Sequence, residues 1–568
     1  MDFQKLVDVY EELEKTSSGN KLREILANFF KEVPHDDIAI VSYLTLGKIA
    51  SDYESVVLGM AEKMILKALA AAAGKDLSEI NKLMRKYGDA GLVAEEALKS
   101  KPRTLVPVGK LTIHELFEKL HKIATISGSG SQDQKAKLLI SLLQKSSSKG
   151  AKYVIRIVLG TLRMGVAEMT VLDSLALAFT DEKKNKEFLE RAYNICPDVG
   201  VIAETMSKKG LKGLEKIDVH VGRPIKMMLA QRVKKLEEIT KKMPGEVTAE
   251  GKYDGERVQA HKTKNGIILF SRRLENISDQ YPDLVGYLEN NLEAKEFVVE
   301  GEILALDKEG NLLPFQTLMQ RRRKHDIERY IEKIPVIVKL FDLLYVDGQS
   351  WLNKSYLERT TKLAKMVKKN KKVLLADKIT TSDLGKINKF FKQMLKAGDE
   401  GIIVKSHDGV YQAGTRGWNW IKWKKDYVSE MVDNFDLVLI GAFYGKGRRS
   451  GSYGALLCAA YDQKEDQFFS VCKLGTGLTD ENLEGLPKKM EKYVSDKKPA
   501  RVTVKKEMEP DVWFEPEIVV EVLAAEVTKS PFHTAGYALR FPRFVNYRKD
   551  KDAEQATTVK EIKEMFEK

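Results

Sequence analysis

EGKYDGER, at residues 250–257, sets one lysine between two glycines and several carboxylates. The surrounding run GEVTAEGKYDGERVQAHK alternates in character, which predicts a strand in or beside which Lys252 lies. Gly251 and Gly255 would let the backbone come close to a ligand there. Alternate residues of a strand point to the same face, so we expect Glu250 and Lys252 to share one. Taken alone, the octet is equally consistent with a surface lysine among acidic neighbours and with a nucleophilic amine, which needs desolvation or nearby cations to lose its proton.

The composition is that of a basic, multidomain protein. A chain of 568 residues exceeds a single hydrophobic core and predicts roughly three or four domains. With 43% hydrophobic and 31% charged residues and no apolar run of membrane-spanning length, no membrane span is expected. Cys196, Cys458 and Cys472 are isolated thiols, which disfavours a zinc site or a disulfide framework and fits a reducing cytoplasm. The net charge of +13 favours a polyanionic partner, nucleic acid first, over a merely basic protein.

Residues 1–218 show helical periodicity almost throughout. Segments such as KLREILANFFKEV and SVVLGMAEKMILKALAAAA place apolar residues three and four apart, so we expect an all-α domain of many short helices. The loop SGSGSQDQK at residues 127–135 precedes a helix expected to begin around Gln132, where exposed amides suit a phosphate; a flexible linker is equally consistent. Arg156 and Arg163 lie beside glycines and could follow a nucleic-acid backbone, although packing of a buried helix accounts for the apolar residues there equally well.

From residue 219 to residue 426, strand-like alternation interleaves with helices, which predicts an α+β domain. FSRRLENIS places Arg272 at the end of a predicted hairpin strand, and the fork of an arginine suits phosphate. EFVVEGEILALD puts Glu300 and Glu302 on one strand face. Carboxylates in an apolar strand are costly unless they are paired or metal-bound. A functional site that contains these two glutamates is therefore favoured over an exposed strand face. Phe341, in PVIVKLFDLLYVDG, is by itself far more typical of a core residue than of a base-stacking platform.

DEGIIVKS and TRGWNWIKWKKDY add a carboxylate and several cations to this domain. Glu400 precedes a buried strand that ends at Lys405. Lys422 and Lys424 share one face of the next predicted strand with a tryptophan, and Arg416 precedes them in a turn that contains glycine. Such a set of cations is typical of a polyphosphate site.

The last part of the chain, residues 427–568, is predicted to be rich in short strands. FDLVLIGAFYGKGRRSGSYGALLCAAY reads as a strand, a basic glycine-rich turn and a second strand, which predicts a small β-barrel of the OB-fold type. Such a barrel suits single strands and nicked duplexes. LRFPRFVNYRKDKDAEQATTV carries Arg548, Asp550 and Lys551 just before a C-terminal helix; an exposed charged loop is the alternative.

Six segments in this order, KYDGER, SRRLEN, VVEGEI, LFDLLY, EGIIVK and WIKWKKDY, resemble the ordered motifs of the nucleotidyltransferases, which include DNA ligases, RNA ligases and mRNA capping enzymes. A lone KxDG is weak, but six such segments within one domain are strong. The whole chain resembles the ATP-dependent DNA ligases of the archaeal and eukaryotic replicative type. LRMGVAEMTVLDSLA is similar to part of their helical DNA-binding domain, and RKDK is similar to their final motif. The resemblance implies three domains: a DNA-binding domain (1–218), an adenylation domain (219–426) and an OB-fold domain (427–568).

The resemblance also implies a role for each candidate residue. Lys252 matches the nucleophile that takes AMP from ATP, passes it to the 5′-phosphate of a nick, and so lets the 3′-hydroxyl close the strand. Magnesium, or another divalent cation, is implied as the metal. The other matched positions are Glu250 at the adenine amino group, Phe341 as the stacking aromatic, Arg257 and Arg272 at ribose and phosphate, Glu302 at ribose or metal, Glu400 at the metal, Arg416, Lys422 and Lys424 at the phosphates, and Arg548 and Lys551 at the departing pyrophosphate.

Partners and location follow from the same resemblance. We expect a monomer that acts on nicked duplex DNA in replication, repair and recombination, in an archaeal-like cytoplasm. The last domain is expected to change its orientation on a hinge near residues 425–428. A sliding-clamp contact is doubtful, because KSKPRTL at residues 99–105 lacks the aromatic pair of the usual clamp-binding segment. An RNA ligase or capping-type enzyme and a non-catalytic DNA-binding scaffold are the alternative hypotheses.

Overall fold

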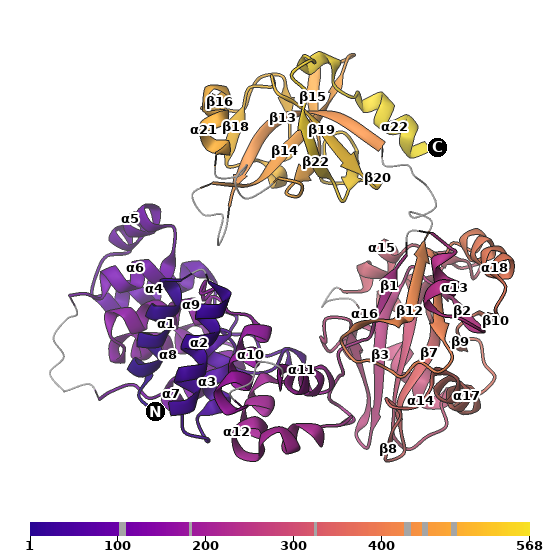
Figure 1. The fold of residues 1–568 in the computed structure, drawn as a ribbon. Helices are drawn as coiled ribbons and strands as arrows, with labels where there is room; N and C mark the ends of the chain where they lie inside the picture. The colour runs from indigo at the N-terminus through magenta and orange to yellow at the C-terminus, as the bar shows by residue number, and fades with distance from the viewer. Residues whose placement is uncertain are drawn as a thin grey trace. The chain divides into compact units, whose positions relative to one another are not determined.

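The computed structural model describes residues 1–16, 18–100, 109–180, 185–233, 235–322, 327–424, 433–445, 452–478 and 485–567 (Figure 1), except for the side chains at 322, 327 and 433. The chain divides into two compact units, Met1–Trp423 and Lys424–Lys568. Within the described ranges, no helix is both long and apolar enough to cross a membrane. The expected hinge, and most of the segment judged for clamp binding, lie outside the described residues.

The first part of the chain is helical, which confirms the all-α prediction for this region (Figure 1). Its helices are α1 (Phe3–Glu14), α2 (Gly19–Glu32), α3 (Ile38–Thr45), α4 (Glu62–Ala73), α5 (Leu77–Tyr87), α6 (Ala90–Ala97), α7 (Ile113–Thr125), α8 (Ser131–Lys145), α9 (Ser148–Val158), α10 (Glu168–Thr180), α11 (Lys186–Ile195) and α12 (Val199–Glu215). Helix α8 begins within one residue of the expected start, after a left-handed Gly130 with φ of 77°. The glycine of SGSGS therefore serves to turn the chain into the helix.

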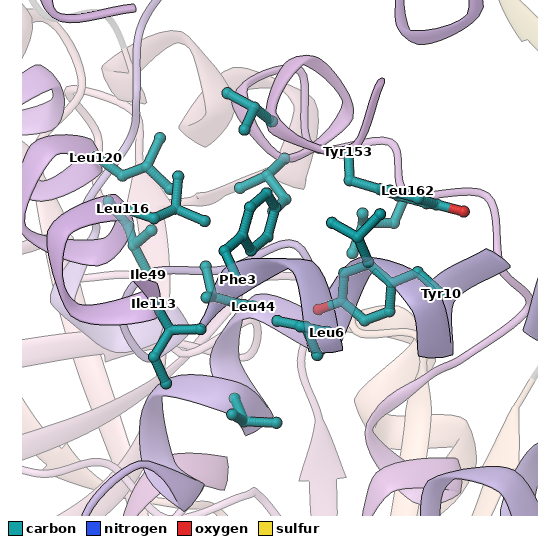
Figure 2. Close-up of a cluster of buried hydrophobic side chains, with 14 of the residues drawn as sticks. Phe3, Leu6, Tyr10, Leu44, Ile49, Ile113, Leu116, Leu120, Tyr153 and Leu162 are labelled. Atoms are coloured by element: carbon teal, nitrogen blue, oxygen red, sulfur yellow. The ribbon is translucent and has the colours of Figure 1, made fainter. Parts of the chain in front are cut away.

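Helix α1 shows how one apolar stripe organises this region. Its N-cap Asp2 accepts a hydrogen bond from the backbone N–H of Gln4 at 2.9 Å, which satisfies an otherwise unpaired amide. Phe3, Leu6 and Tyr10 recur at helical spacing and are all buried. Figure 2 shows these three side chains among apolar residues of α3, α7 and α9, and the Tyr10 and Tyr153 rings meet edge to face with centroids 5.1 Å apart. The region therefore has a core of its own.

Buried ion pairs correct one expectation about this domain. Arg156 is 6% exposed, pairs with Glu14, and donates from Nε to Asp89 Oδ1 at 3.3 Å. An arginine committed to two carboxylates inside the domain does not lie along a nucleic-acid backbone, so that hypothesis is wrong for Arg156. Arg163 is more open, with a side chain 39% exposed, although its NH1 lies 2.8 Å from Asp89 Oδ2.

Two sheets form the middle of the chain. One has the strand order β1-β12-β11-β2-β10, and the other has the order β4-β3-β5-β7-β8 with β6 and β9 attached. Helix α18 packs on the first sheet, and α14 and α17 pack on the second (Figure 1). Apolar residues of both sheets meet in one cluster that includes Met228, Val298, Leu344 and Trp420. The inner faces of the sheets therefore face each other.

The elements of this region alternate between strand and helix, as the α+β prediction requires. The strands are β1 (Leu229–Arg232), β2 (Val247–Lys252), β3 (Glu256–Thr263), β4 (Gly266–Ser271), β5 (Phe297–Leu306), β6 (Leu312–Leu313), β7 (Val336–Val346), β8 (Gln349–Ser350), β9 (Val373–Leu375), β10 (Lys378–Thr381), β11 (Gly401–Ser406) and β12 (Arg416–Lys424). The helices are α13 (Glu238–Lys242), α14 (Pro282–Asn291), α15 (Phe315–Leu318), α16 (Ile327–Lys333), α17 (Tyr356–Met366) and α18 (Leu384–Lys396).

The unit Lys424–Lys568 is mainly β-structure. Its larger sheet follows the order β16-β18-β13-β14-β15-β17, with β19 joined to β13 and β22 joined to β19, and β20 and β21 form a separate pair. The strands are β13 (Asp433–Tyr444), β14 (Tyr453–Asp462), β15 (Gln467–Leu474), β16 (Val494–Ser495), β17 (Val502–Thr503), β18 (Val512–Phe514), β19 (Val519–Ala524), β20 (Glu526–Lys529), β21 (Tyr537–Arg540) and β22 (Arg543–Tyr547), and the helices are α21 (Leu486–Met490) and α22 (Val559–Glu567). Short paired strands before a C-terminal helix agree with the predicted character of this part.

Candidate active site

A pocket opens between the two sheets of the middle region, and both sheets contribute to its wall. Fifteen residues line it: Leu229, Ala230, Glu250, Gly251, Lys252, Tyr253, Arg257, Arg272, Glu302, Phe341, Ile403, Lys405, Arg416, Trp420 and Lys422. Eight of the residues selected from the sequence are among them, although they come from β2, β3, β5, β7 and β12 and from the turn after β4. The fold therefore gathers residues that are far apart in the chain.

Lys252 ends β2 and reaches into this pocket with a side chain 22% exposed. Its Nζ lies 2.6 Å from Glu400 Oε2, and the backbone N–H of Glu400 donates to the Lys252 carbonyl at 2.9 Å. The register of β2 with β11 places Gly401 opposite Lys252, so Glu400 arrives beside the lysine by strand pairing. An amine in a half-buried pocket, next to one carboxylate and among several cations, can act as a nucleophile once it loses its proton.

The two glycines of the octet serve the protein's own packing. A Cβ at Gly255 would lie 2.3 Å from the carbonyl oxygen of Ile303 on β5. A Cβ at Gly251 would lie 3.0 Å from the ring of Tyr253. The expectation that both glycines admit a ligand is therefore wrong for Gly255, where the close neighbour is strand β5.

Carboxylates crowd around Lys252. Burial raises the pKa of Glu302 to about 7; Lys252 and Arg257 oppose that rise, and Glu400 adds to it. Burial also raises the pKa of Asp254, which lies near Glu400 and accepts a hydrogen bond from the Phe315 N–H at 3.3 Å. These carboxylates repel one another and are poorly solvated, so a cation placed among them would be stabilised.

A β-bulge sets the position of Phe341. In the pairing of β7 with β5, Leu340 lies opposite Gly301 and Asp342 opposite Glu300, which leaves Phe341 outside the regular ladder. A bulge of this kind re-aims a side chain. The Phe341 ring is half-buried, lines the pocket, and meets the Trp420 ring edge to face at 6.2 Å.

Arg257 is fixed to the floor of the pocket. Its NH1 donates to the Met228 carbonyl at 2.7 Å, and its NH2 donates to Glu300 Oε2 at 2.8 Å. The guanidinium lies 5.4 Å from the centroid of the Phe341 ring. Because Glu300 is fully buried, it serves to hold Arg257.

Three of the remaining predicted cations also line the pocket, and two of them are exposed. Arg272 and Arg416 are exposed, and Lys422 is half-buried; all three line the pocket. Lys424, at the end of β12, is half-buried and is not part of the pocket lining. Cations that line one pocket can hold the phosphates of a ligand.

Arg548 and Lys551 lie in the other unit, where one carboxylate holds both. Arg548 NH1 lies 2.9 Å from Asp436 Oδ1, and Lys551 Nζ lies 2.7 Å from Asp436 Oδ2. Arg548 also donates to both carboxylate oxygens of Asp550, at 3.0 and 2.8 Å. The three charged residues of RKDK singled out from the sequence therefore form one ion-pair group with β13.

Sequence reasoning gave no role to two residues that line the pocket and to one that lies behind its wall. Lys405 and Trp420 line it directly. Tyr356, on α17, donates a hydrogen bond to Glu250 Oε1 from behind. For Lys405, a signal was present in the sequence. It ends the apolar run EGIIVK, and a charge inside a buried strand requires a partner.

Comparison with known proteins agrees with this geometry. Models of three protein families match the chain in order: the DNA ligase N terminus over residues 2–176, the ATP dependent DNA ligase domain over residues 227–424, and the ATP dependent DNA ligase C terminal region over residues 449–551. The chain is 45% identical over 582 residues to DNA ligase 2 of Thermofilum pendens, with 99% of this chain and 96% of the relative covered. It is 43% identical to the DNA ligase of Staphylothermus marinus, with 100% and 99% covered.

The chain belongs to the ATP-dependent DNA ligases. Their three-domain architecture, with a helical N-terminal region, accounts for the order of the elements. A solved structure named Pmar-Lig_Pre superposes with a TM-score of 0.57 at 18% identity, covering 96% of this chain and 99% of that one, which supports the fold. As an ATP-dependent DNA ligase, the enzyme seals nicks in DNA through adenylation, and this selects the DNA ligase hypothesis over the RNA-ligase, capping and scaffold alternatives.

Proposed function

We propose that Lys252 is the residue of this DNA ligase that becomes adenylated. Its Nζ attacks the α-phosphorus of ATP, a P–N bond forms, the P–O bond to pyrophosphate breaks, and the amine releases a proton. The adenylate then passes to the 5′-phosphate of a nick, and the 3′-hydroxyl displaces AMP. The observation that carries this proposal is the position of Lys252 in a pocket that also contains Arg257, Arg272, Arg416 and Lys422. Cations that surround the transferred phosphoryl group stabilise its charge.

The other lining residues divide into a base end and a phosphate end. At the buried end, Glu250 accepts a hydrogen bond from the adenine amino group, and Phe341 stacks on the base. Arg257, held by Glu300, reaches the ribose, and Glu302 contacts the ribose or a metal. At the open end, Arg272, Arg416 and Lys422 hold phosphates, in keeping with the exposure of the two arginines, and Lys424, which lies outside the lining at the end of β12, assists them. This order runs a nucleotide along the pocket with its α-phosphate at Lys252.

We propose magnesium as the metal of the reaction. Glu302 and Glu400 offer hard oxygen ligands beside Lys252, and the pKa of Glu302 is raised chiefly by burial and further by the neighbouring Glu400 carboxylate. No group of three or more His, Cys, Asp or Glu suited to a metal occurs in the described part of the chain. That fits Mg²⁺, which is bound through one or two carboxylates and substrate phosphates. When bound, the ion would neutralise charge on the phosphates.

The wider proposals concern the partner and the setting. The helical region is proposed to hold nicked duplex DNA, and the C-terminal unit is proposed to be an OB-fold barrel whose Arg548 and Lys551 orient the departing pyrophosphate. We propose a monomer that serves replication, repair and recombination in the cytoplasm. A sliding-clamp contact through residues 99–105 is not proposed.

Covalent labelling tests the proposed nucleophile. The full-length enzyme is incubated with ATP labelled at the α-phosphate, denatured, and separated on a gel, and the sealing of a nicked duplex is measured in parallel. We expect labelled protein with the wild type and none with Lys252→Ala, because the variant lacks the amine that would carry AMP. Lys262→Ala, at the far end of β3 and paired with Glu289, is the control and should label like the wild type. Undiminished labelling of Lys252→Ala would overturn the assignment.

A further inference from the structure

A buried ion pair closes the base end of the pocket. Glu250 and Lys405 have side chains 4% and 1% exposed, and Lys405 Nζ lies 2.6 Å from Glu250 Oε2. The other carboxylate oxygen, Oε1, accepts a hydrogen bond from the Tyr356 hydroxyl. Both Glu250 and Lys405 line the pocket, while Tyr356 supports the carboxylate from helix α17.

The surroundings of Lys405 hold its ammonium in one place. Nζ lies 4.3 Å from the centroid of the Trp420 ring and 4.7 Å from that of Phe341. It also lies 3.4 Å from the Phe341 carbonyl, to which it donates a hydrogen bond. That carbonyl belongs to the bulged residue of β7, so the bulge serves the lysine as well as the ring. A cation faced by aromatic rings and a carbonyl is stabilised there without water.

Stability alone is a weak reason for such a pair. Replacing a buried ion pair by apolar residues of similar volume is often neutral or stabilising, because two charges must be desolvated to form it. The pair stands where a ligand would contact it, because both side chains line the pocket; they are its buried part, whereas Arg272 and Arg416 are exposed. This position points to a role in recognition.

We propose that Lys405 sets the base preference of the pocket by holding the Glu250 carboxylate in place as a hydrogen-bond acceptor. This inference rests on the proposed function, in which Glu250 faces the base. An ionised carboxylate only accepts hydrogen bonds and has about four lone-pair positions, so it retains capacity beyond Lys405 and Tyr356. Adenine presents an amino donor at C6, and guanine presents a carbonyl acceptor at the same place. Glu250 therefore binds the first and repels the second.

Tyr356 reinforces this selection. Burial, together with the adjacent Glu250 carboxylate, raises the pKa of Tyr356 well above its usual value, so its hydroxyl remains a donor. Without Lys405, the buried Glu250 carboxylate would be held by Tyr356 alone, and its oxygens would no longer be fixed as acceptors toward the base. The preference for adenine over guanine is then lost. Lys405 acts through Glu250 and is a positioning residue.

The test compares nucleotide preference among lysine variants of the full chain. Rates of covalent labelling are measured with α-labelled ATP and with α-labelled GTP at equal concentration, and the ATP-to-GTP ratio is the readout. We expect Lys405→Met to lower this ratio by about tenfold or more, since a mispaired buried polar group is what discriminates between such substrates. Lys405→Arg retains the charge and should keep most of the preference. Lys262→Met is the matched lysine control outside the pocket and should keep all of it.

A second variant keeps the test decisive if Lys405→Met does not fold. Glu250→Gln/Lys405→Met replaces the pair by neutral residues of similar size, and its amide can serve either base, so its ratio should also fall. A wild-type enzyme without preference, or wild-type ratios in both variants, would overturn the role of Lys405. Failure of the wild type to label with ATP would instead overturn the proposed function, so the two failures are distinguishable.

Discussion

Phe341 depends on its neighbour Asp342 for its place in the pocket. Asp342 and Arg359 are both fully buried and form a two-pronged pair, with Nε–Oδ1 at 2.7 Å and NH2–Oδ2 at 3.1 Å. Arg359 also donates to the carbonyls of Lys354 and Gly409, at 2.6 and 3.0 Å. One guanidinium thus ties strand β7, helix α17 and the turn after β11 together immediately behind the bulge at Phe341.

At this residue scale, we predict that Arg359→Met lowers the free energy of unfolding by about 3–5 kcal/mol, because it leaves Asp342 buried and uncompensated. Urea unfolding of the full chain at neutral pH measures the change. The double variant Asp342→Asn/Arg359→Met removes the stranded charge and should recover part of the loss. A loss below about 1 kcal/mol for the single variant would mean that the pair is poorly formed or solvated.

Strand β3 illustrates what an element contributes as a whole. Arg257, Gln259 and His261 lie on one of its faces, and the last two hold the chain segment that precedes β1. Gln259 Oε1 accepts from the Ile225 N–H at 2.7 Å, and His261 Nδ1 accepts from the Gly222 N–H at 3.1 Å. An imidazole that accepts at Nδ1 and lies 2.9 Å from the Gln259 amide oxygen at Nε2 is neutral. Burial lowers the pKa of His261 to about 3, and His220 adds to this.

At the element scale, this predicts a loss of stability in mild acid. Because the folded state holds the proton less tightly than the unfolded chain, His261 contributes stability that is complete above pH 6.5 and is lost as the pH falls from 6.5 toward 3. Between pH 7.5 and 5.5 the loss from this residue should be about 1.4 kcal/mol. The free energy of unfolding is measured for the wild type and for His261→Gln at both pH values. The contribution of His261 is the difference between the two proteins in how much this free energy falls with pH. Equal slopes would contradict a neutral His261.

At the scale of the whole molecule, the proposed work is divided between two units. Lys252 lies in Met1–Trp423, whereas Arg548 and Lys551 lie in Lys424–Lys568, gathered by Asp436. Their side chains are 26% and 32% exposed, so they are oriented yet accessible to a ligand. If they act on pyrophosphate, they are needed for the first step and not for the later ones.

We predict that Arg548→Ala slows covalent self-adenylation by about 10- to 100-fold, the effect of removing one preorganised charge from a phosphoryl transfer. Sealing of a nick that already carries the 5′-adenylate should change much less. Single-turnover assays of each step with the same preparation separate the two effects. Lys497→Ala, in the same unit, controls for a general effect of removing positive charge. Equal losses in both steps would refute a role confined to the first.

The sequence by itself was sufficient for the enzyme class and for eight of the residues that line the pocket, although not for Lys405 and Trp420. The octet at 250–257 and the five segments after it are short, local patterns, and chemistry at phosphate constrains which residue types they contain. Helical and strand periods are likewise local, which is why the all-α and α+β characters could be predicted. These properties do not depend on which strand pairs with which.

Only the tertiary structure decided which charged side chains face the pocket and which form ion pairs inside the protein. Arg156 could be placed with Glu14 and Asp89, and Lys405 with Glu250, only after distant segments had packed. The bulge at Phe341 depends on the register of β7 against β5, and the close approach at Gly255 depends on β5 as well. Register and burial arise from long-range pairing, whereas a sequence pattern records only which residue types are present. The octet therefore identified Lys252 as a candidate, and the two sheets supplied the surroundings in which its chemistry can occur.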